Sequence, residues 1–193
     1  EKPKIAVSFS GGRTSAYMSY LIKKHWSDSH DLVFAFANTG KENEETLEFA
    51  HKCDIEFGLE LHWVEAVVTN EKGVGTTFKR VNFASANRTG EPFEAEIQKW
   101  GIPNVATPKC SDQLKAQPLK KLFQQEFGTN KFHTAIGIRM DEFDRMSADR
   151  KKLRIIYPLI SEWPTRKTDV DAFFSKMPFD LKLKAYQGNC DLC

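Results

Sequence analysis

Along residues 1–68, continuous apolar stretches alternate with stretches in which apolar residues recur every three or four positions. The first pattern predicts buried strands, and the second predicts helices that bury one face. The strands are expected at residues 4–10, 32–37 and 59–68, and the helices at residues 14–24 and 43–58. This alternation predicts an α/β fold: a doubly wound, mostly parallel sheet with helices on both faces.

Residues 69–109 break this alternation, because they are rich in glycine and proline and hold one short helical piece at 93–100. Long irregular segments inside compact domains are usually functional or disordered. The aromatic residues of this segment indicate that it is packed, so we expect it to line a substrate cleft. Beyond it the pattern predicts, in order, a helix, two strands and a helix at residues 112–127, 132–138, 155–160 and 169–176. Asp169 and Asp171 are expected to cap the last helix.

The length of 193 residues and the 40% hydrophobic content suit one domain, which we expect to cover residues 1–193 with a cysteine-containing tail from about residue 180. The net charge of +2 provides no strong global field for nucleic acid or membranes. Four lysines that lie close together in the sequence still allow a local basic face: Lys109, Lys115, Lys120 and Lys121. No stretch approaches the roughly 20 apolar residues of a membrane span. The uneven cysteines argue against a secreted disulfide scaffold, so we expect a cytoplasmic protein.

The segment at residues 4–15 carries the strongest functional signal. An apolar strand leads into Ser10, the glycine pair Gly11-Gly12, and a helix that begins near Arg13. Glycines let a ligand approach the main chain, and the unpaired N–H groups of a helix N-terminus favour an anion. An ordinary strand-to-helix turn with a serine cap is the alternative. The candidate phosphate-binding residues are Ser8, Ser10, Gly11, Gly12, Arg13, Thr14 and Ser15.

The run at residues 10–15 lacks the glycine spacing of Rossmann and Walker loops and resembles the S-G-G-x-x-S signature of the PP-loop family. That family includes ATP pyrophosphatases, phosphoadenylyl-sulfate (PAPS) reductase-like proteins and enzymes that thiolate tRNA or DNA. Residues 38–46 are similar to the N-T-G-x-x-x-x-E-T element of the PAPS reductase-like proteins. The resemblance implies that Asn38, Thr39 and Gly40 belong to a nucleotide site. An acidic first turn that suits the helix dipole is the alternative explanation of the carboxylates there.

Residues 137–145 follow a predicted strand and resemble the G-x-R-x-x-E-x-x-R element of the same family. A guanidinium binds phosphate or sulfate oxygens through two parallel hydrogen bonds, so Arg139 and Arg145 suit an anionic nucleotide. Glu142 is expected to orient Arg139, and Gly137 completes the candidate set. A salt-bridged surface turn is the alternative.

Residues 110–119 resemble the C-x-x-x-L-K-x-x-P-L run of sulfonucleotide reductases, whose iron–sulfur branch has two adjacent cysteines here and a later C-x-x-C. This chain has Cys110 at the first place, and Cys190 and Cys193 at the second. Three thiolates would ligate a 4Fe-4S cluster with one iron left open, as in several tRNA-thiolating enzymes. Zinc would need a fourth ligand. A reduced thiol pair with a redox role and an incidental pair are the alternatives. The chain stops directly after this motif, and we expect natural residues beyond it.

The resemblance covers most of the chain and implies an adenine-nucleotide enzyme of sulfur metabolism that reduces an adenylylated sulfate (APS or PAPS) with an iron–sulfur cluster and a thiol or other electron donor. Two departures matter: the E-C-G-L-H tail of true reductases is missing, and the phosphate loop is intact. An intact loop suits ATP-dependent adenylation, assisted by magnesium, with sulfur transfer to nucleic acid. Arg13 and Arg139 would stabilise the developing charge in either reaction. A non-catalytic nucleotide-binding module is a third hypothesis, and an oligomer is compatible with the sequence.

Overall fold

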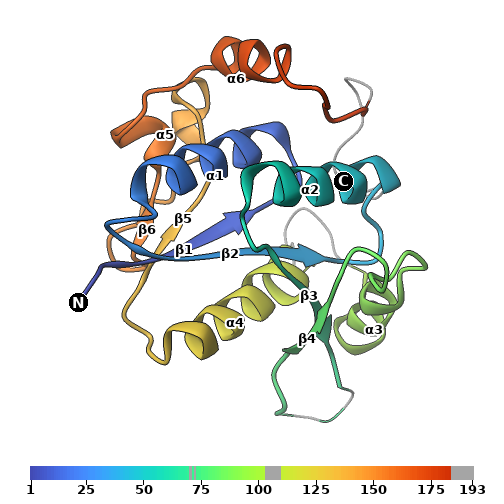
Figure 1. Ribbon diagram of the computed structural model, residues 1–193. Helices are drawn as coiled ribbons and strands as arrows, with labels where there is room; N and C mark the ends of the chain where they lie inside the picture. Colours follow the sequence, from blue (N-terminus) through green and yellow to red (C-terminus); the bar gives the residue numbers. More distant parts are fainter. Residues whose placement is uncertain (70, 72, 103–109, 184–193) are drawn as a thin grey trace.

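The computed structural model describes residues 1–69, 71, 73–102 and 110–183, and its centre is a twisted sheet (Figure 1). Within these residues the sheet has six strands in the order β4-β3-β2-β1-β5-β6. All neighbouring pairs are parallel except β3 and β4, which are antiparallel. The strands are β1 (Lys4–Phe9), β2 (Asp31–Asn38), β3 (His62–Val67), β4 (Thr77–Val81), β5 (His133–Ala135) and β6 (Ile155–Ile156).

Helices lie on both faces of the sheet, which confirms the predicted α/β, doubly wound architecture (Figure 1). One face carries α1 (Arg13–Trp26), α2 (Glu44–Phe57), the short α5 (Pro158–Ser161) and α6 (Lys167–Phe174); α4 (Gln117–Phe127) covers the other, and α3 (Glu91–Trp100) lies beside the sheet at its β3–β4 end. Two irregular helical turns complete the structure: η1 (Cys110–Ala116) and η2 (Met140–Arg145). No helix within the described ranges is both long and apolar enough to cross a bilayer.

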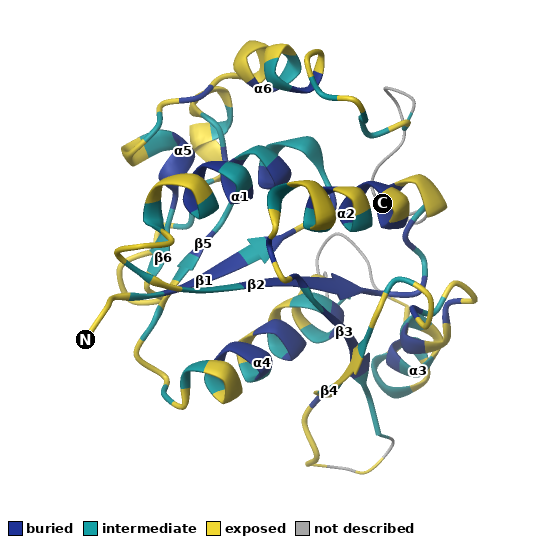
Figure 2. Ribbon diagram, in the orientation of Figure 1, coloured by how far each residue is buried: buried dark blue, intermediate teal, exposed yellow. Residues whose placement is uncertain are grey.

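The alternation of side chains along β1 divides the core into two layers. Ile5, Val7 and Phe9 point to the layer shared with α1, α2 and α6, whereas Ala6 points to the layer shared with α4. The α4 layer uses small residues on the sheet and large ones on the helix: Ala6, Ala35, Ala37 and Val64 face Leu119, Leu122 and Phe123. The central strands are consequently buried on both sides (Figure 2).

Three expectations from the sequence need correction. The strand expected at residues 155–160 ends after Ile156, because Pro158 lacks an N–H donor and begins α5 instead. The helix expected at 112–127 begins with the π-type turn η1 and becomes α-helical around Pro118, which cannot donate an intrahelical hydrogen bond. The segment at 69–109 also contains the unexpected edge strand β4, whose side chains are mostly exposed.

Candidate nucleotide site

The loop after β1 is closed by the hydroxyl of Ser15. Its Oγ accepts a hydrogen bond from the main-chain N of Ser10 at 3.0 Å, lies 2.9 Å from the Oγ of Ser10, and donates to the carbonyl of Gly12 at 3.0 Å. One buried hydroxyl therefore joins the end of β1 to the first turn of α1. This arrangement fixes the shape of the loop through the N–H of Ser10 and does not use those of Gly12, Arg13 and Thr14.

Gly11 is required by both its conformation and its surroundings. Its φ is +83°, and a Cβ there would lie 2.5 Å from Cγ2 of Thr46. Gly12 is extended and immediately precedes α1 without a side-chain cap. Within the described part of the chain, no hydrogen bond uses the main-chain N–H groups of Gly12, Arg13 or Thr14. These groups, together with the helix dipole, are the donor set that an anion needs.

The element after β5 packs directly against this loop, although the two are far apart in the sequence. A Cβ on Gly137 would lie 3.1 Å from Cα and 3.2 Å from N of Ser15. Arg139 Nη1 donates to the hydroxyl of Thr14 at 2.7 Å across a sequence separation of 125 residues. The structure thus brings together the two motifs that the sequence assigned to one anionic ligand.

Carboxylates hold the Arg139 guanidinium beside the loop. Its Nη2 lies 3.0 Å from Asp141 and its Nη1 lies 3.3 Å from Glu142, whose other oxygen lies 2.6 Å from Arg145. The hydrogen bond from Arg139 lowers the pKa of Asp141 below its ordinary value. The Arg139 side chain is 16% exposed and that of Arg145 is 66% exposed. Glu142 lies where the sequence predicts, against Arg139, while Arg145 stands at the solvent side of the same carboxylate.

Arg13 lies in the first turn of α1, but its side chain is engaged by acids near the other end of the chain. Its Nε donates to Asp180 at 2.7 Å, and its Nη1 lies 3.1 Å from Asp171. Neither partner was expected from the sequence. Asp171 was expected to cap α6, but it lies inside that helix, where it also pairs with Lys167. Asp169 does cap that helix, accepting from the main-chain N of Arg166 at 2.7 Å. Pairing across more than 150 residues leaves no local sequence signal.

The turn after β2 is built into the protein interior. Asn38 is fully buried, and its Nδ2 donates to Glu65 and to the carbonyl of Asn87, both at 2.8 Å. Its Oδ1 accepts from the main-chain N of Gly40 at 3.2 Å. Gly40 has a φ of +80°, and a Cβ there would lie 2.6 Å from Oδ1 of Asn87. The Asn38 side chain is therefore used inside the fold, and Glu65 and Asn87 are supporting residues that the motif did not reveal.

A buried acid connects this turn to η1. Glu42 accepts a hydrogen bond from Thr39 at 3.1 Å, and the same oxygen lies 3.2 Å from Nζ of Lys115. Burial raises the pKa of the Glu42 carboxyl above its ordinary value, against the opposing effect of Lys115. Lys115 belongs to η1, which begins at the candidate metal ligand Cys110. The ion pair between Lys115 and Glu42 therefore connects η1 to the turn after β2.

Cys110 is half-buried and not in a disulfide. Cys190 and Cys193 lie outside the described residues, so the three-thiolate site stays a prediction. Among the residues that the structure describes, no group of three or more His, Cys, Asp and Glu side chains is arranged to hold a metal ion.

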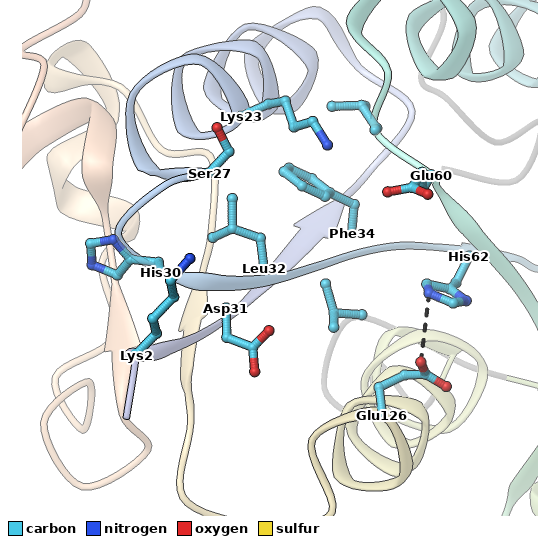
Figure 3. Close-up of a pocket in the computed structure, with 12 residues that line it drawn as sticks. Lys2, Lys23, Ser27, His30, Asp31, Leu32, Phe34, Glu60, His62 and Glu126 are labelled. Carbon is cyan, nitrogen blue, oxygen red and sulfur yellow. Dashed lines mark ion pairs between the residues drawn. The ribbon is translucent and has the colours of Figure 1, made fainter.

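Ser8 differs from the other candidate residues. It precedes the phosphate loop on β1 and lines a hollow next to α4, on the opposite face of the sheet from α1. A second hollow of about 470 Å³ lies at the amino ends of β2 and β3, remote from the loop (Figure 3). It includes both acids and bases, with His62 and Glu126 at 3.9 Å. Neither hollow was anticipated from the sequence.

A family model described as the phosphoadenosine phosphosulfate reductase domain matches residues 4–158. The chain belongs to this family. The resemblance inferred from the motifs is therefore confirmed, and family membership supports a nucleotide-binding role in sulfur metabolism. The matched region contains the phosphate loop, the Asn38 turn, η1 and the Arg139 element.

Two relatives extend the comparison. The nin region protein ORF290 of Escherichia phage lambda is 31% identical over 190 residues, which are 97% of this chain and 64% of that protein. The protein MJ0066 of Methanocaldococcus jannaschii is 27% identical over 150 residues, which are 77% of this chain and 26% of that protein. The chain thus spans less than two thirds of the length of either relative.

The fold is also similar to that of the PAPS reductase from Candida auris, solved as a phosphate complex. The TM-score is 0.51 at 17% sequence identity, and the match covers 90% of this chain and 72% of that one. At this identity the likeness shows the fold alone.

Proposed function

We propose that the chain binds an adenine nucleotide at the carboxyl edge of the sheet and reduces an adenylylated sulfate, APS or PAPS. The observation that carries this proposal is the meeting of two donor groups: the N–H groups at the start of α1 and the Arg139 guanidinium, joined through Thr14 at 2.7 Å. A phosphosulfate has two adjacent anionic groups. A helix N-terminus and a fixed guanidinium side by side supply complementary positive potential for both.

In this proposal the residues of the loop act mainly by binding and orientation. The main-chain N–H groups of Gly12, Arg13 and Thr14 would receive the oxygens of one anionic group, and Arg139 would receive those of the second. Donors fixed in advance stabilise charge that develops on a leaving nucleotide without having to reorganise during the reaction. Two electrons from a thiol donor would break the bond between sulfur and the bridging oxygen, releasing sulfite and the nucleotide.

An iron–sulfur cluster belongs to the same proposal. Cys110, Cys190 and Cys193 would hold a 4Fe-4S cluster, because thiolate sulfur is the usual ligand of such clusters. Cys110 suits this role in being half-buried and not in a disulfide. When bound, the cluster would supply electron-transfer chemistry beside the nucleotide. Anaerobic purification should yield about four irons and four sulfides per chain, and Cys110→Ser should lower both. Metal-free protein that still reduces APS would remove the cluster from the proposal.

ATP-dependent adenylation is the second candidate, favoured by one observation: the phosphate loop is intact, with its N–H groups at the start of α1 unused within the described part of the chain. Such a loop would hold the departing pyrophosphate, with magnesium as a counter-ion, and an activated nucleic-acid group would then accept sulfur. Arg13 would contact the pyrophosphate after its side chain turns away from Asp171 and Asp180. Nucleotide binding with no turnover would instead support a non-catalytic module.

One experiment separates these candidates. The protein is incubated with APS, PAPS or ATP plus a dithiol, and sulfite and pyrophosphate are measured alongside nucleotide affinity by calorimetry. Sulfite release supports reduction, and pyrophosphate release supports adenylation. Gly12→Asp should abolish binding, because its carboxylate would stand among the anion donors. Gly75→Asp is the matched control, since Gly75 does not have a left-handed conformation and a Cβ there meets nothing within 4 Å. Unchanged affinity of Gly12→Asp would refute the site.

A further inference from the structure

The hollow beside α4 has an unusual combination of walls. It measures about 530 Å³ and lies between α4 and the strands β5 and β6. Leu119 and Phe123 of α4 and Ile136 after β5 provide apolar surface. Hydroxyl and amide groups are interspersed with them: Ser8, Gln124, Asn130 and Thr134. A volume of this size is in the range of small-ligand sites, roughly 300–1,000 Å³.

Every charged residue that lines this hollow is basic. Lys120 contributes from α4, and Lys152 and Arg154 contribute from the segment before β6. They belong to a wider basic surface, because residues 150–154 read Arg-Lys-Lys-Leu-Arg and are all exposed. The hollow at the other end of the sheet is different, since it is also lined by Asp31, Glu60 and Glu126 (Figure 3).

Within the described ranges, these cations also have no internal counter-charge. Arg13, Arg88 and Arg139 each pair with a carboxylate. By contrast, no ion pair in the described ranges involves Lys120 or any basic residue of 150–154. Positive charge left unpaired around a recess is the complement of a polyanion.

Arg154 is held on the rim at a conformational cost. Its φ is +54°, a left-handed value that is uncommon for a residue with a side chain and worth a functional explanation. Its carbonyl accepts a hydrogen bond from the main-chain N of Thr134 at 2.9 Å, which fixes it against β5. The neighbouring Leu153 is 56% exposed although it is apolar. An arginine whose main chain is fixed and an exposed apolar side chain thus lie next to each other at the opening.

We propose that this hollow, with Lys120, Lys152, Leu153 and Arg154 at its opening, binds single-stranded nucleic acid. The cations would contact backbone phosphates, and an unstacked base would enter the hollow. The hydroxyls and amides inside suit the hydrogen-bonding edges of a base, which an acidic peptide does not present. A duplex keeps its bases stacked, so its bases could not enter.

The position of the hollow connects it to the nucleotide site without depending on the reaction there. Ser8 lies two residues before Ser10 of the phosphate loop, and Ile136 directly precedes Gly137. A base in the hollow would therefore lie on the opposite face of β1 and β5 from α1, close to the edge where the nucleotide is proposed to bind. The interaction requires neither reduction nor adenylation at the loop.

Fluorescence anisotropy with a labelled 12-nucleotide single strand, measured over a range of salt concentrations, tests the proposal. Lys120→Gln/Lys152→Gln should weaken binding at least tenfold and reduce the slope of log Kd against log salt by about 1.4, or about 0.7 per lost phosphate contact. Lys24→Gln/Lys52→Gln removes the same charge from exposed positions on α1 and α2 and should change Kd less than twofold. Equal losses in the two variants would overturn the proposal.

A second variant tests the hollow separately from the charge. Leu153→Ser removes the exposed apolar side chain without changing the charge. Because the position is exposed, the fold should survive, and single-strand binding should weaken at least tenfold. Three results would each refute the proposal: no binding even at low salt, equal affinity for a duplex of the same sequence, or equal affinity for polyglutamate. Full displacement of the strand by stoichiometric ATP or APS would make the hollow a mononucleotide subsite instead. Because Gly12→Asp should leave strand binding intact, failure here is distinguishable from failure of the nucleotide site.

Discussion

The loop after β1 and the turn after β2 end neighbouring parallel strands, yet their polar groups are used in opposite ways. In the first, the N–H groups of Gly12 and Thr14 have no hydrogen-bond partner within the described part of the chain. In the second, the Asn38 side chain makes three hydrogen bonds, to Glu65, Asn87 and Gly40. Both segments match family motifs, but the first leaves main-chain donors available to a ligand, whereas the Asn38 side chain is engaged within the fold. The second holds the edge of the sheet in shape.

The largest effect on stability is expected at Glu65, which we expect to support the turn after β2 and not to contact the ligand. Its side chain is fully buried and accepts from Asn38 and Asn87, and it pairs with Lys79 at 3.2 Å. Glu65→Ala leaves these donors unsatisfied and should lower the free energy of unfolding by about 3–5 kcal/mol. Urea denaturation measures this. Lys79→Ala removes the half-exposed cation but keeps the hydrogen bonds from Asn38 and Asn87 to the carboxylate, so it should cost less than Glu65→Ala. A loss for Glu65→Ala no larger than the control's would contradict the supporting role.

The opposite behaviour is expected of Arg139. Arg139→Gln removes the guanidinium beside Thr14 and should weaken nucleotide affinity at least tenfold, about 1.4 kcal/mol. The free energy of unfolding should change by less than that, because the carboxylates that pair with Arg139 are partly exposed to water. Calorimetry and urea denaturation of the same preparation give both values. Arg145→Gln offers a graded comparison, since its side chain is 66% exposed and should matter less. If the Arg139→Gln variant binds nucleotide with unchanged affinity, Arg139 is not part of the site.

The pH dependence of stability tests the role of the buried Glu42 in the turn after β2. Because burial raises the pKa of Glu42, its ionised form destabilises the fold at pH values above that raised pKa. Glu42→Gln should therefore raise Tm at pH 7, on the order of a few degrees. The advantage should shrink as pH falls and disappear below the ordinary value of 4.5, where both states are protonated. Glu48→Gln, at an exposed position of α2, should show no such trend. A pH-independent difference would contradict the titration of Glu42.

The smallest effect is expected where an internal ion pair competes with the ligand. Asp180→Asn removes the negative charge that pairs with Arg13. The Arg13 guanidinium could then turn more easily toward an anion bound at the loop after β1. Nucleotide affinity should rise roughly two- to fivefold, which is the range expected from an exposed ion pair. Asp149→Asn, an exposed acid outside this network, is the control. Lower affinity in Asp180→Asn would mean that the acid positions Arg13 for the ligand.

The sequence predicted those parts of the site that rest on local patterns. The β1–loop–α1 unit follows from an apolar run, two glycines and a helical period, and the Arg139 element was found by its motif. Glu65 could not be found in this way, because a single acid inside an otherwise apolar strand has no signal until Asn38 and Asn87 are placed beside it. The same holds for Asp180, which meets Arg13 only through the packing of the chain after α6. Long-range pairs of this kind depend on tertiary structure.

The reversed strand β4 has a consequence for how the protein behaves at high concentration. It forms one edge of the sheet, and its exposed side chains include Lys79 and Arg80. Charged side chains on an edge strand discourage a second sheet from adding to it. The opposite edge, β6, is only two residues long and offers little backbone for such pairing. Both open borders of the sheet are therefore poor templates for strand-to-strand aggregation.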